Sequence, residues 1–227
     1  MRAFWFLAIV GVLGCAILLS LGTWQLKRLN WKTAILAEID ANIAAAPIPL
    51  PDQIDPQQDK YRAVTATGTL LPGEIHVWTT FKAQGAGYRV IAPFETDTQG
   101  RILVDRGFVP TARKQDPRPL GETRLVGNLH WPDESSSFTP DPDRTGNVWY
   151  ARDVDVLASE LDTRPVLLVL REKPQDNAAP TPMPITTAGI PNNHLQYTIT
   201  WFSLAAIWGG MTAYFLRRTG TQPKGSN

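Results

Sequence analysis

Two long stretches without a charged residue lie near the two ends of this chain. The first covers residues 3–26 and the second covers residues 195–216. At a rise of about 1.5 Å per residue, a helix of either length crosses the hydrocarbon core of a bilayer, which is about 30 Å thick. The sequence between them is polar enough to need water. We therefore expect a membrane protein with two transmembrane helices that flank a soluble domain.

The first stretch has two alternative interpretations as a targeting signal. Arg2 and the apolar run after it are similar to a cleaved secretory signal, and residues 12–15 loosely resemble a lipidation box. However, the run is too long for a secretory signal, no small-residue cleavage site follows, and the apolar residues continue past Cys15. We expect an uncleaved span. Because Cys15 is the only cysteine, the chain has no internal disulfide and no thiolate metal cage.

Basic residues beside the second stretch indicate the orientation. Arg217 and Arg218 follow it directly, and no Lys or Arg lies between Lys173 and Arg217. This bias predicts a cytoplasmic carboxyl terminus and, with two spans, a cytoplasmic amino terminus. Three basic residues after the first span oppose this orientation, although long domains cross membranes largely regardless of charge. They are Lys27, Arg28 and Lys32.

The region between the spans changes from a helical to a β pattern. Residues 31–45 have helical spacing and end at a proline cluster, whereas β-branched and aromatic runs separated by Gly and Pro begin at Tyr61. Short turns at residues 71–73 and 97–100 predict antiparallel hairpins, and Asp153 can cap a helix over residues 154–161. The expected strands are residues 61–71, 74–82, 88–95, 101–109, 123–131 and 166–172.

These patterns predict a fold class and four segments. The fold class is a membrane protein in which two transmembrane helices flank a β-rich α+β extracytoplasmic domain built on antiparallel strands. Residues 1–27 form the first span and residues 28–190 form a periplasmic domain that ends in a proline-rich tether. Residues 191–217 form the second span and residues 218–227 form a cytoplasmic tail. The expected location is the inner membrane of a bacterial cell.

Polar residues at the outer ends of the two spans are the candidate functional residues, because polar groups at the edge of a membrane are costly. Trp24, Gln25 and Arg28 end the first span, and the second begins with Asn192, Asn193, His194, Gln196 and Tyr197. The expected topology places both sets at the same depth, where they can share one site. On the second helix, one continuous face is predicted from helical spacing. It consists of His194, Tyr197, Thr198, Trp201 and Ala205.

A neutral imidazole flanked by aromatic rings and near an arginine has the chemistry of an axial haem ligand. His194 would bind the iron, the rings would cover the macrocycle, and Arg28 could pair with a propionate. The alternative is that these residues form only an amphipathic belt at the membrane interface, with Arg28 as an anchor for the helix end. Composition by itself favours the belt.

Three motifs in this sequence resemble those of one protein family. Residues 22–28 resemble G-x-W-Q-x-x-R, residues 102–110 resemble V-x-R-G-[WF]-V-P, and residues 191–202 resemble N-N-H-L-x-Y followed by T-W-F. The motifs are similar in kind and order to those of the Surfeit locus protein 1 family of cytochrome c oxidase assembly factors. The resemblance extends over residues 4–218.

The resemblance implies a factor that receives haem a and promotes its insertion into the large catalytic subunit of cytochrome c oxidase, subunit I, without turning over a substrate. It implies that His194 matches a histidine implicated in haem binding, and that Trp201 matches a tryptophan of the same helix. The implied partners are subunit I, haem a synthase as a further candidate, and membrane lipid. Arg106, in the second motif, either contacts a partner or pairs with Asp105, and the structural pairing is favoured.

Other functions are less well supported. A net charge of +1 gives no basic excess for binding nucleic acid. His76 and His130 have no second ligand at metal-binding spacing, and no nucleophile, carboxylate pair or phosphate loop is recognisable. Three classes of function remain open. They are a haem-handling assembly chaperone, a scaffold that stabilises oxidase intermediates without a cofactor, and a membrane-anchored enzyme of unknown type.

Overall fold

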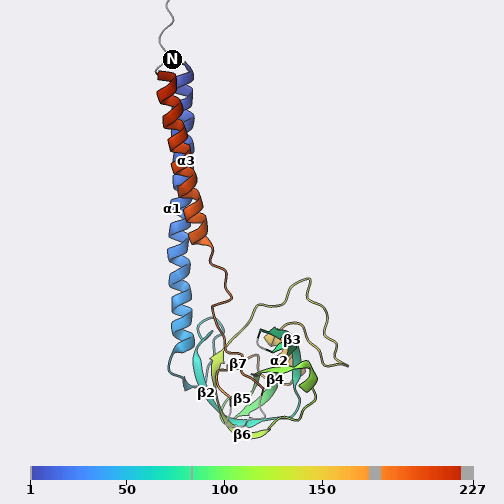
Figure 1. Cartoon of the computed structure of the whole chain (residues 1–227). Helices are drawn as coiled ribbons and strands as arrows, with labels where there is room; N and C mark the ends of the chain where they lie inside the picture. Colours follow the sequence, from blue (N-terminus) through green and yellow to red (C-terminus); the bar gives the residue numbers. More distant parts are fainter. Residues whose placement is uncertain (1, 83, 174–179, 221–227) are drawn as a thin grey trace, which may run out of the picture. The chain divides into compact units, whose positions relative to one another are not determined.

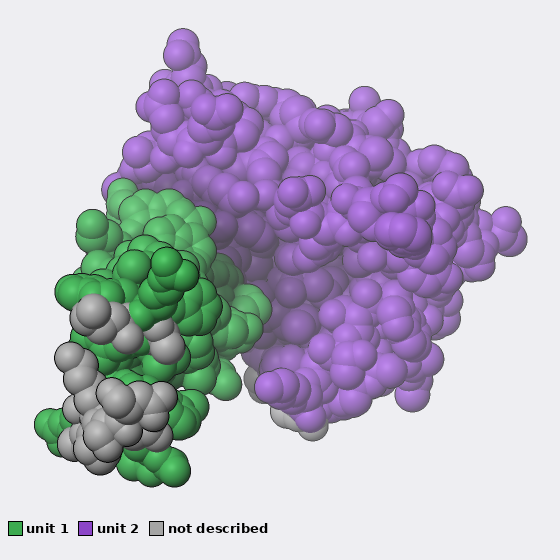
Figure 2. Space-filling model, turned by 90° about the horizontal axis from the view of Figure 1, so that it is seen from above, with its two compact units in different colours: residues 1–38, 188–227 green, residues 39–187 purple. Residues whose placement is uncertain are grey.

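A computed structural model of the chain describes residues 2–82, 84–173 and 180–220. The chain forms two compact units, which Figure 2 colours separately. Residues 1–38 and 188–227 form the first, called the helix pair, and residues 39–187 form the second, called the β domain. The elements are α1 (Arg2–Ala44), β1 (Ile48–Pro49), β2 (Ala63–Leu70), β3 (Ile75–Phe81), β4 (Gly85–Thr96), β5 (Gly100–Pro110), η1 (Thr111–Arg113), β6 (Gly121–Leu129), α2 (Val154–Glu160), β7 (Leu167–Leu170) and α3 (His194–Gly220).

The two apolar stretches form long helices, as predicted. Segments Phe4–Ala44 of α1 and His194–Thr219 of α3 are long and apolar enough to cross a membrane. The expected short helix at residues 31–45 is not separate, because α1 continues through it without a break. The first proline after this region is Pro47, and it lies just beyond the end of the helix. Within the helix pair, α1 and α3 lie side by side (Figure 1).

Five strands of the β domain close into a barrel. β2 pairs with β6 along its length and also with β4 through residues 68–70, so the order β2-β6-β7-β5-β4 returns to β2. Gly68 permits this closure, because a Cβ there would lie 2.0 Å from the carbonyl oxygen of Glu95. β1 and β3 extend the sheet beyond the ring.

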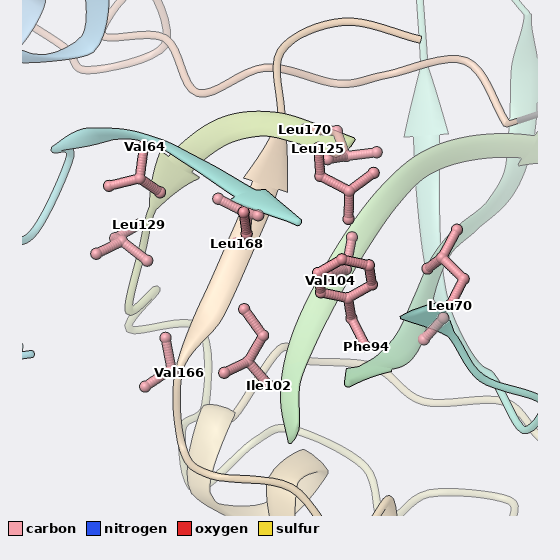
Figure 3. Close-up of a cluster of buried hydrophobic side chains, with 12 residues drawn as sticks. Val64, Leu70, Phe94, Ile102, Val104, Leu125, Leu129, Val166, Leu168 and Leu170 are labelled. Atoms are coloured by element: carbon pink, nitrogen blue, oxygen red, sulfur yellow. The ribbon is translucent and has the colours of Figure 1, made fainter. Parts of the chain in front are cut away.

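Two apolar clusters lie on opposite faces of the barrel wall. One is built from all five barrel strands and fills the interior, where Phe94 and Leu168 are fully buried (Figure 3). The other lies outside the barrel, between the wall and α2, and includes Leu157 and Leu167. In β7 successive residues alternate between the clusters, so all four are buried. This explains why β7 has an apolar sequence without polar alternation.

The predicted strands and the predicted helix after Asp153 agree with the structure, whereas part of the predicted pairing does not. Each expected strand is present, and α2 is capped by Asp153, whose carboxylate accepts a hydrogen bond from the Val156 amide. The hairpin at residues 97–100 joins β4 and β5 as predicted. The prediction of a hairpin at residues 71–73 was wrong. β2 and β3, which flank this turn, do not pair with each other, because each of them pairs with β4. β7 also runs parallel to β5, so the sheet is not purely antiparallel.

The described part of the proline-rich segment is attached to the β domain. Thr181 exchanges two backbone hydrogen bonds with Phe108 of β5, and the Met183 carbonyl accepts from Arg89. Gly107, with φ +108°, allows the backbone of Thr181 to lie close to β5, because a Cβ at Gly107 would lie 2.1 Å from the Thr181 carbonyl oxygen. Residues 174–179 of the expected tether lie outside the described residues.

Candidate functional site

Small residues allow α1 and α3 to pack closely along their length. An added Cβ at Gly14 would lie 2.3 Å from Nε1 of Trp208, and one at Gly22 would lie 2.7 Å from the Phe202 ring. Glycines at such positions let helix backbones approach in a membrane, where association depends on van der Waals packing and interhelical hydrogen bonds. Trp208 supplies one such bond by donating from Nε1 to the carbonyl oxygen of Gly11 at 3.1 Å. The helices therefore run antiparallel, and the start of α3 faces the region of α1 around residue 25.

At that end, the structure brings Gln25 and His194 together. Nδ1 of His194 lies 2.8 Å from Oε1 of Gln25, and both residues are partly buried. Because an amide oxygen only accepts hydrogen bonds, Nδ1 must carry the proton and donate it. Nε2, the other ring nitrogen, has no hydrogen-bond partner among the described residues. This contact fixes the tautomer in which Nε2 can bind a metal.

The other candidate residues form no side-chain hydrogen bond with this pair among the described residues. Trp24 and Tyr197 are 57% and 52% exposed, and Trp201 is half-buried. The guanidinium of Arg28 lies over the Trp31 ring, 3.9 Å from its centroid. Arg28 therefore has an aromatic partner that the sequence did not indicate, while its hydrogen-bonding edges have no acceptor among the described residues.

The predicted face of α3 lies mainly against α1. Thr198 and Ala205 are buried, and His194 and Trp201 are half-buried, whereas Tyr197 is exposed to the outside of the pair. Helical spacing alone could not distinguish the edge of this face from its centre. A further contact was missed: Nζ of Lys32 donates to the carbonyl oxygen of Pro191. The only feature of the sequence that pointed to this contact was the position of Lys32, one helical turn beyond Arg28.

The residues at this end of the helix pair fit a haem by the chemistry of their donors. Nδ1 of His194 is held by a hydrogen bond to Gln25, and histidines that bind metals are commonly oriented in this way through their other ring nitrogen. Exposed aromatic rings of Trp24 and Tyr197 offer flat apolar surface, and Arg28 offers a cation. No cluster of three or more His, Cys, Asp or Glu side chains suited to a metal ion occurs among the described residues. An iron held by the porphyrin itself would not need one.

The β domain contains a buried ionic network around Asp105. Oδ2 of Asp105 lies 2.6 Å from Nε of Arg89 and 3.2 Å from Nη1 of Arg152, and Arg152 also pairs with Glu134. Burial disfavours the carboxylate of Glu134, but hydrogen bonds and charge from Arg152 outweigh it and lower its pKa. The sequence-based pairing of Asp105 with Arg106 was wrong. The backbone reason is a bulge between Val90 and Ile91, which makes Arg106 the unpaired extra residue of β5.

The two histidines of the β domain pack against neighbouring side chains. His76 is 4% exposed, and its Nε2 lies 2.9 Å from Oε1 of Glu74. His130 stacks on Tyr61, with ring centroids 5.4 Å apart. Burial, followed by the positive charges of Arg152 and Lys60, lowers the pKa of His130 to about 4, so this ring is neutral at physiological pH.

Comparison with known proteins identifies relatives over most of the chain. Residues 12–206 match the model of the SURF1 family. The chain is 32% identical to Surfeit locus protein 1 of Rattus norvegicus, over 95% of this chain and 76% of the rat protein. It is 33% identical to a SURF1-like protein of Monosiga brevicollis, over 91% of this chain and 85% of that protein. A SURF1-like protein of Drosophila melanogaster is 32% identical over 89% of this chain and 73% of its own length.

Proposed function

Because this chain belongs to the SURF1 family, which is implicated in cytochrome c oxidase assembly, we propose that it binds haem a and promotes its insertion into the large catalytic subunit. In this proposal haem a is cargo. The protein holds it at the outer end of the helix pair and releases it to subunit I, and no covalent bond of the cargo changes. The protein would act as a chaperone and not as an enzyme.

One observation carries the proposal: His194 and Gln25 share a hydrogen bond that leaves Nε2 of the imidazole as a lone-pair donor. A histidine that served only as an interfacial belt residue would not need its tautomer fixed by a residue on the other helix. His194 is the proposed iron ligand, and Gln25 is a positioning residue that orients the ring and keeps Nδ1 protonated.

The remaining candidate residues have supporting roles in this proposal. Trp24, Tyr197 and Trp201 would contact the faces and edges of the macrocycle, where aromatic rings gain from burial and stacking. Arg28 would pair with a propionate, because a guanidinium binds carboxylates in a bidentate manner. Its stacking on Trp31 restrains it close to the same turn of α1.

The proposal includes a location and an orientation. The helix pair would cross the inner membrane of a bacterium, with both termini in the cytoplasm and the β domain in the periplasm. Arg217 and Arg218 at the end of α3 support this orientation through the excess of positive charge on cytoplasmic sides. Lipid, oxidase subunit I and haem a synthase would be the partners.

A scaffold without a cofactor is the second candidate, and one observation favours it. The face of α3 that carries His194 also carries buried Thr198 and Ala205, so the histidine bond to Gln25 could serve helix packing alone. On this hypothesis, the hydrogen bond would lock two spans that hold oxidase intermediates in place.

The two candidates can be separated by purifying the full chain from cells that also make haem a. We expect wild type to carry bound pigment with a Soret band, and His194→Ala to lose it at unchanged expression. Gln196→Ala is the matched control, because Gln196 is an exposed polar residue on the same turn of α3. It should retain the pigment.

Oxidase assembly in a strain that lacks the protein gives the second measurement. The chaperone hypothesis requires His194→Ala to fail in rescuing oxidase activity. If wild type carries no pigment and His194→Ala still rescues assembly, the scaffold is correct and haem binding is refuted.

A further inference from the structure

Arg106 is a buried cation with an unsatisfied donor. It is 2% exposed, and its Nη2 donates to the carbonyl oxygen of Pro119 at 2.9 Å. Its Nη1 is also buried and has no partner among the described residues. A buried charge without full hydrogen bonding is costly, so a protein that retains one generally provides it with a counter-charge or a ligand.

The carboxylates near Arg106 are already engaged. Glu74 pairs with Arg118 and with Nε2 of His76. Asp116 pairs with Arg113, at 2.7 Å between its Oδ2 and the arginine Nε. Among the described residues none of these acids forms an ion pair with Arg106, so the positive charge on its guanidinium has no direct partner.

A pocket opens beside this guanidinium. It has a volume of about 210 Å³, and its lining includes Arg106, Lys114 and Arg118, together with the acids Glu74 and Asp116. Since Arg113 neutralises Asp116 and Arg118 neutralises Glu74, Arg106 and Lys114 leave the pocket positive. Burial, with a further contribution from the charge of Arg118, lowers the pKa of Arg106 despite the opposing effect of Glu74.

The loop that forms the pocket wall is held in place independently of any ligand. Arg118 donates to the carbonyl oxygens of Arg113, Lys114 and Asp116. Nζ of Lys114 donates to the carbonyl oxygen of Gly146 and lies 4.7 Å from the centroid of the Tyr88 ring. The pocket is therefore built before binding, and its cations do not need to be ordered by the ligand.

The rim of the pocket is partly apolar. Its lining includes Leu71, Pro72 and Leu120, which is 54% exposed. A charged floor under an apolar rim suits an anionic group attached to a small apolar body.

We propose that this pocket of the β domain is an oxyanion site, in which the positive charges of Arg106 and Lys114 attract a carboxylate or a phosphate. Guanidinium groups bind both kinds of oxyanion, and a charge-assisted bond of this type is about twice as strong as a neutral one. The arginine of the second sequence motif thus serves as an anion receptor in addition to its structural bond to Pro119.

The test uses the purified full chain in detergent micelles at pH 7.5 and at constant ionic strength set with chloride. Inorganic phosphate and propionate are titrated separately, and the thermal unfolding of the β domain is followed. A ligand that binds only the folded state raises the melting temperature in a saturable way. We expect this for wild type with at least one of the two anions. A response to phosphate alone assigns the site to phosphate groups, and a response to propionate alone assigns it to carboxylates.

Two variants test the residues that define the pocket. Arg106→Gln should raise the half-saturating concentration by about tenfold or more, the effect of losing one charge-assisted bond. Lys114→Ala, at a partly exposed position, should raise it severalfold and keeps the test valid if Arg106→Gln does not fold. Arg124→Gln is the control, because Arg124 is an exposed cation of β6 outside the pocket lining. The proposal is overturned if neither anion stabilises wild type, or if Lys114→Ala and Arg124→Gln respond alike.

Discussion

Gln25 and His194 are 169 positions apart in the chain, yet their side chains share a 2.8 Å hydrogen bond across two helices. The bond joins an amide oxygen, which can only accept, to an imidazole nitrogen, which must therefore donate. The orientation of the histidine ring is thus set by a residue of the other helix.

Gln25→Leu should weaken haem binding while leaving His194 in place. Without the acceptor, Nδ1 is no longer held protonated and the ring is no longer oriented, and loss of such a supporting bond typically costs about 10–100-fold in metal affinity. Titration of the purified protein with haem, followed by Soret absorbance, measures the change. Gln25→Glu keeps an acceptor oxygen and should bind close to wild type. Equal affinity of Gln25→Leu and wild type would show that the bond has no role in ligation.

Gly14→Val should loosen the helix pair. A Cβ at Gly14 would lie 2.3 Å from Nε1 of Trp208, so the indole must move and its bond to Gly11 is strained. We expect a cost of about 1–3 kcal/mol, as for other overpacked contacts. Disulfide formation between cysteines introduced at positions 25 and 194, with Cys15 replaced by alanine, reports the packing and should decrease.

The control for this experiment is Gly210→Val. Gly210 also lies in a membrane helix, but an added Cβ there meets nothing within 4 Å. Its crosslinking yield should equal that of the parent protein. A yield in Gly14→Val as high as in Gly210→Val would contradict the close packing of α1 and α3.

Asp105→Ala should destabilise the β domain strongly. Asp105 is 1% exposed and accepts hydrogen bonds from Arg89 and Arg152, so its removal leaves Arg89 without its counter-charge and Arg152 with Glu134 alone. Breaking a buried pair in this way costs about 3–5 kcal/mol. Chemical denaturation of the full chain in detergent, followed by far-ultraviolet circular dichroism, gives the free energy of unfolding.

Glu160→Ala provides the comparison for Asp105→Ala. Glu160 pairs with Arg144 on the surface of the β domain, where an ion pair contributes about 0–1 kcal/mol. If both variants lost the same small amount of stability, the network around Asp105 would not be an energetic part of the core.

The neutral state of His130 predicts a loss of stability in mild acid. Its pKa is lowered from 6.5 to about 4 in the folded protein, so below pH 6.5 the unfolded chain takes up a proton that the folded chain does not. His130 therefore leaves the free energy of unfolding unchanged above pH 6.5 and lowers it progressively as the pH falls toward 4. A shift of this size corresponds to about 3 kcal/mol, reduced to about 2 by residual solvent exposure.

His130→Gln isolates this effect from the titration of carboxylates. The variant has no group that titrates between pH 6.5 and 4.5 at this position, so its melting temperature should fall less than that of wild type across that interval. Parallel melting curves for the two proteins over the same pH range would show that His130 is accessible to protons in the folded state.

Local patterns in the sequence predicted most elements but not their neighbours. Alternation and turn residues gave the strands, since each depends on residues a few positions apart. The pairing of β2 with β4 and the parallel pairing of β7 with β5 connect segments that are distant in sequence. The two-residue strand β1 is too short to give a pattern of its own.

For the candidate site as well, the sequence identified the residues but not all of their contacts. Membrane depth and motif content identified Gln25 and His194, because polar residues at the ends of spans are conspicuous. The stacking of Arg28 on Trp31 and the exposure of Tyr197 were not predictable, since both depend on the rotation of each helix about its axis. In the β domain, the assumed partner of Arg106 was wrong because a bulge changes which side chains of β5 face each other.

The sequence by itself determined the two apolar helices, the strands between them, and the family to which the chain belongs. These properties follow from hydrophobic period, length and motif order along the chain. Only the tertiary structure decided that the barrel closes, that Asp105 is held by Arg89 and Arg152, and that Gln25 fixes the tautomer of His194. Those properties depend on contacts between residues far apart in the chain, whose geometry is set by the packing of whole elements and not by local propensity.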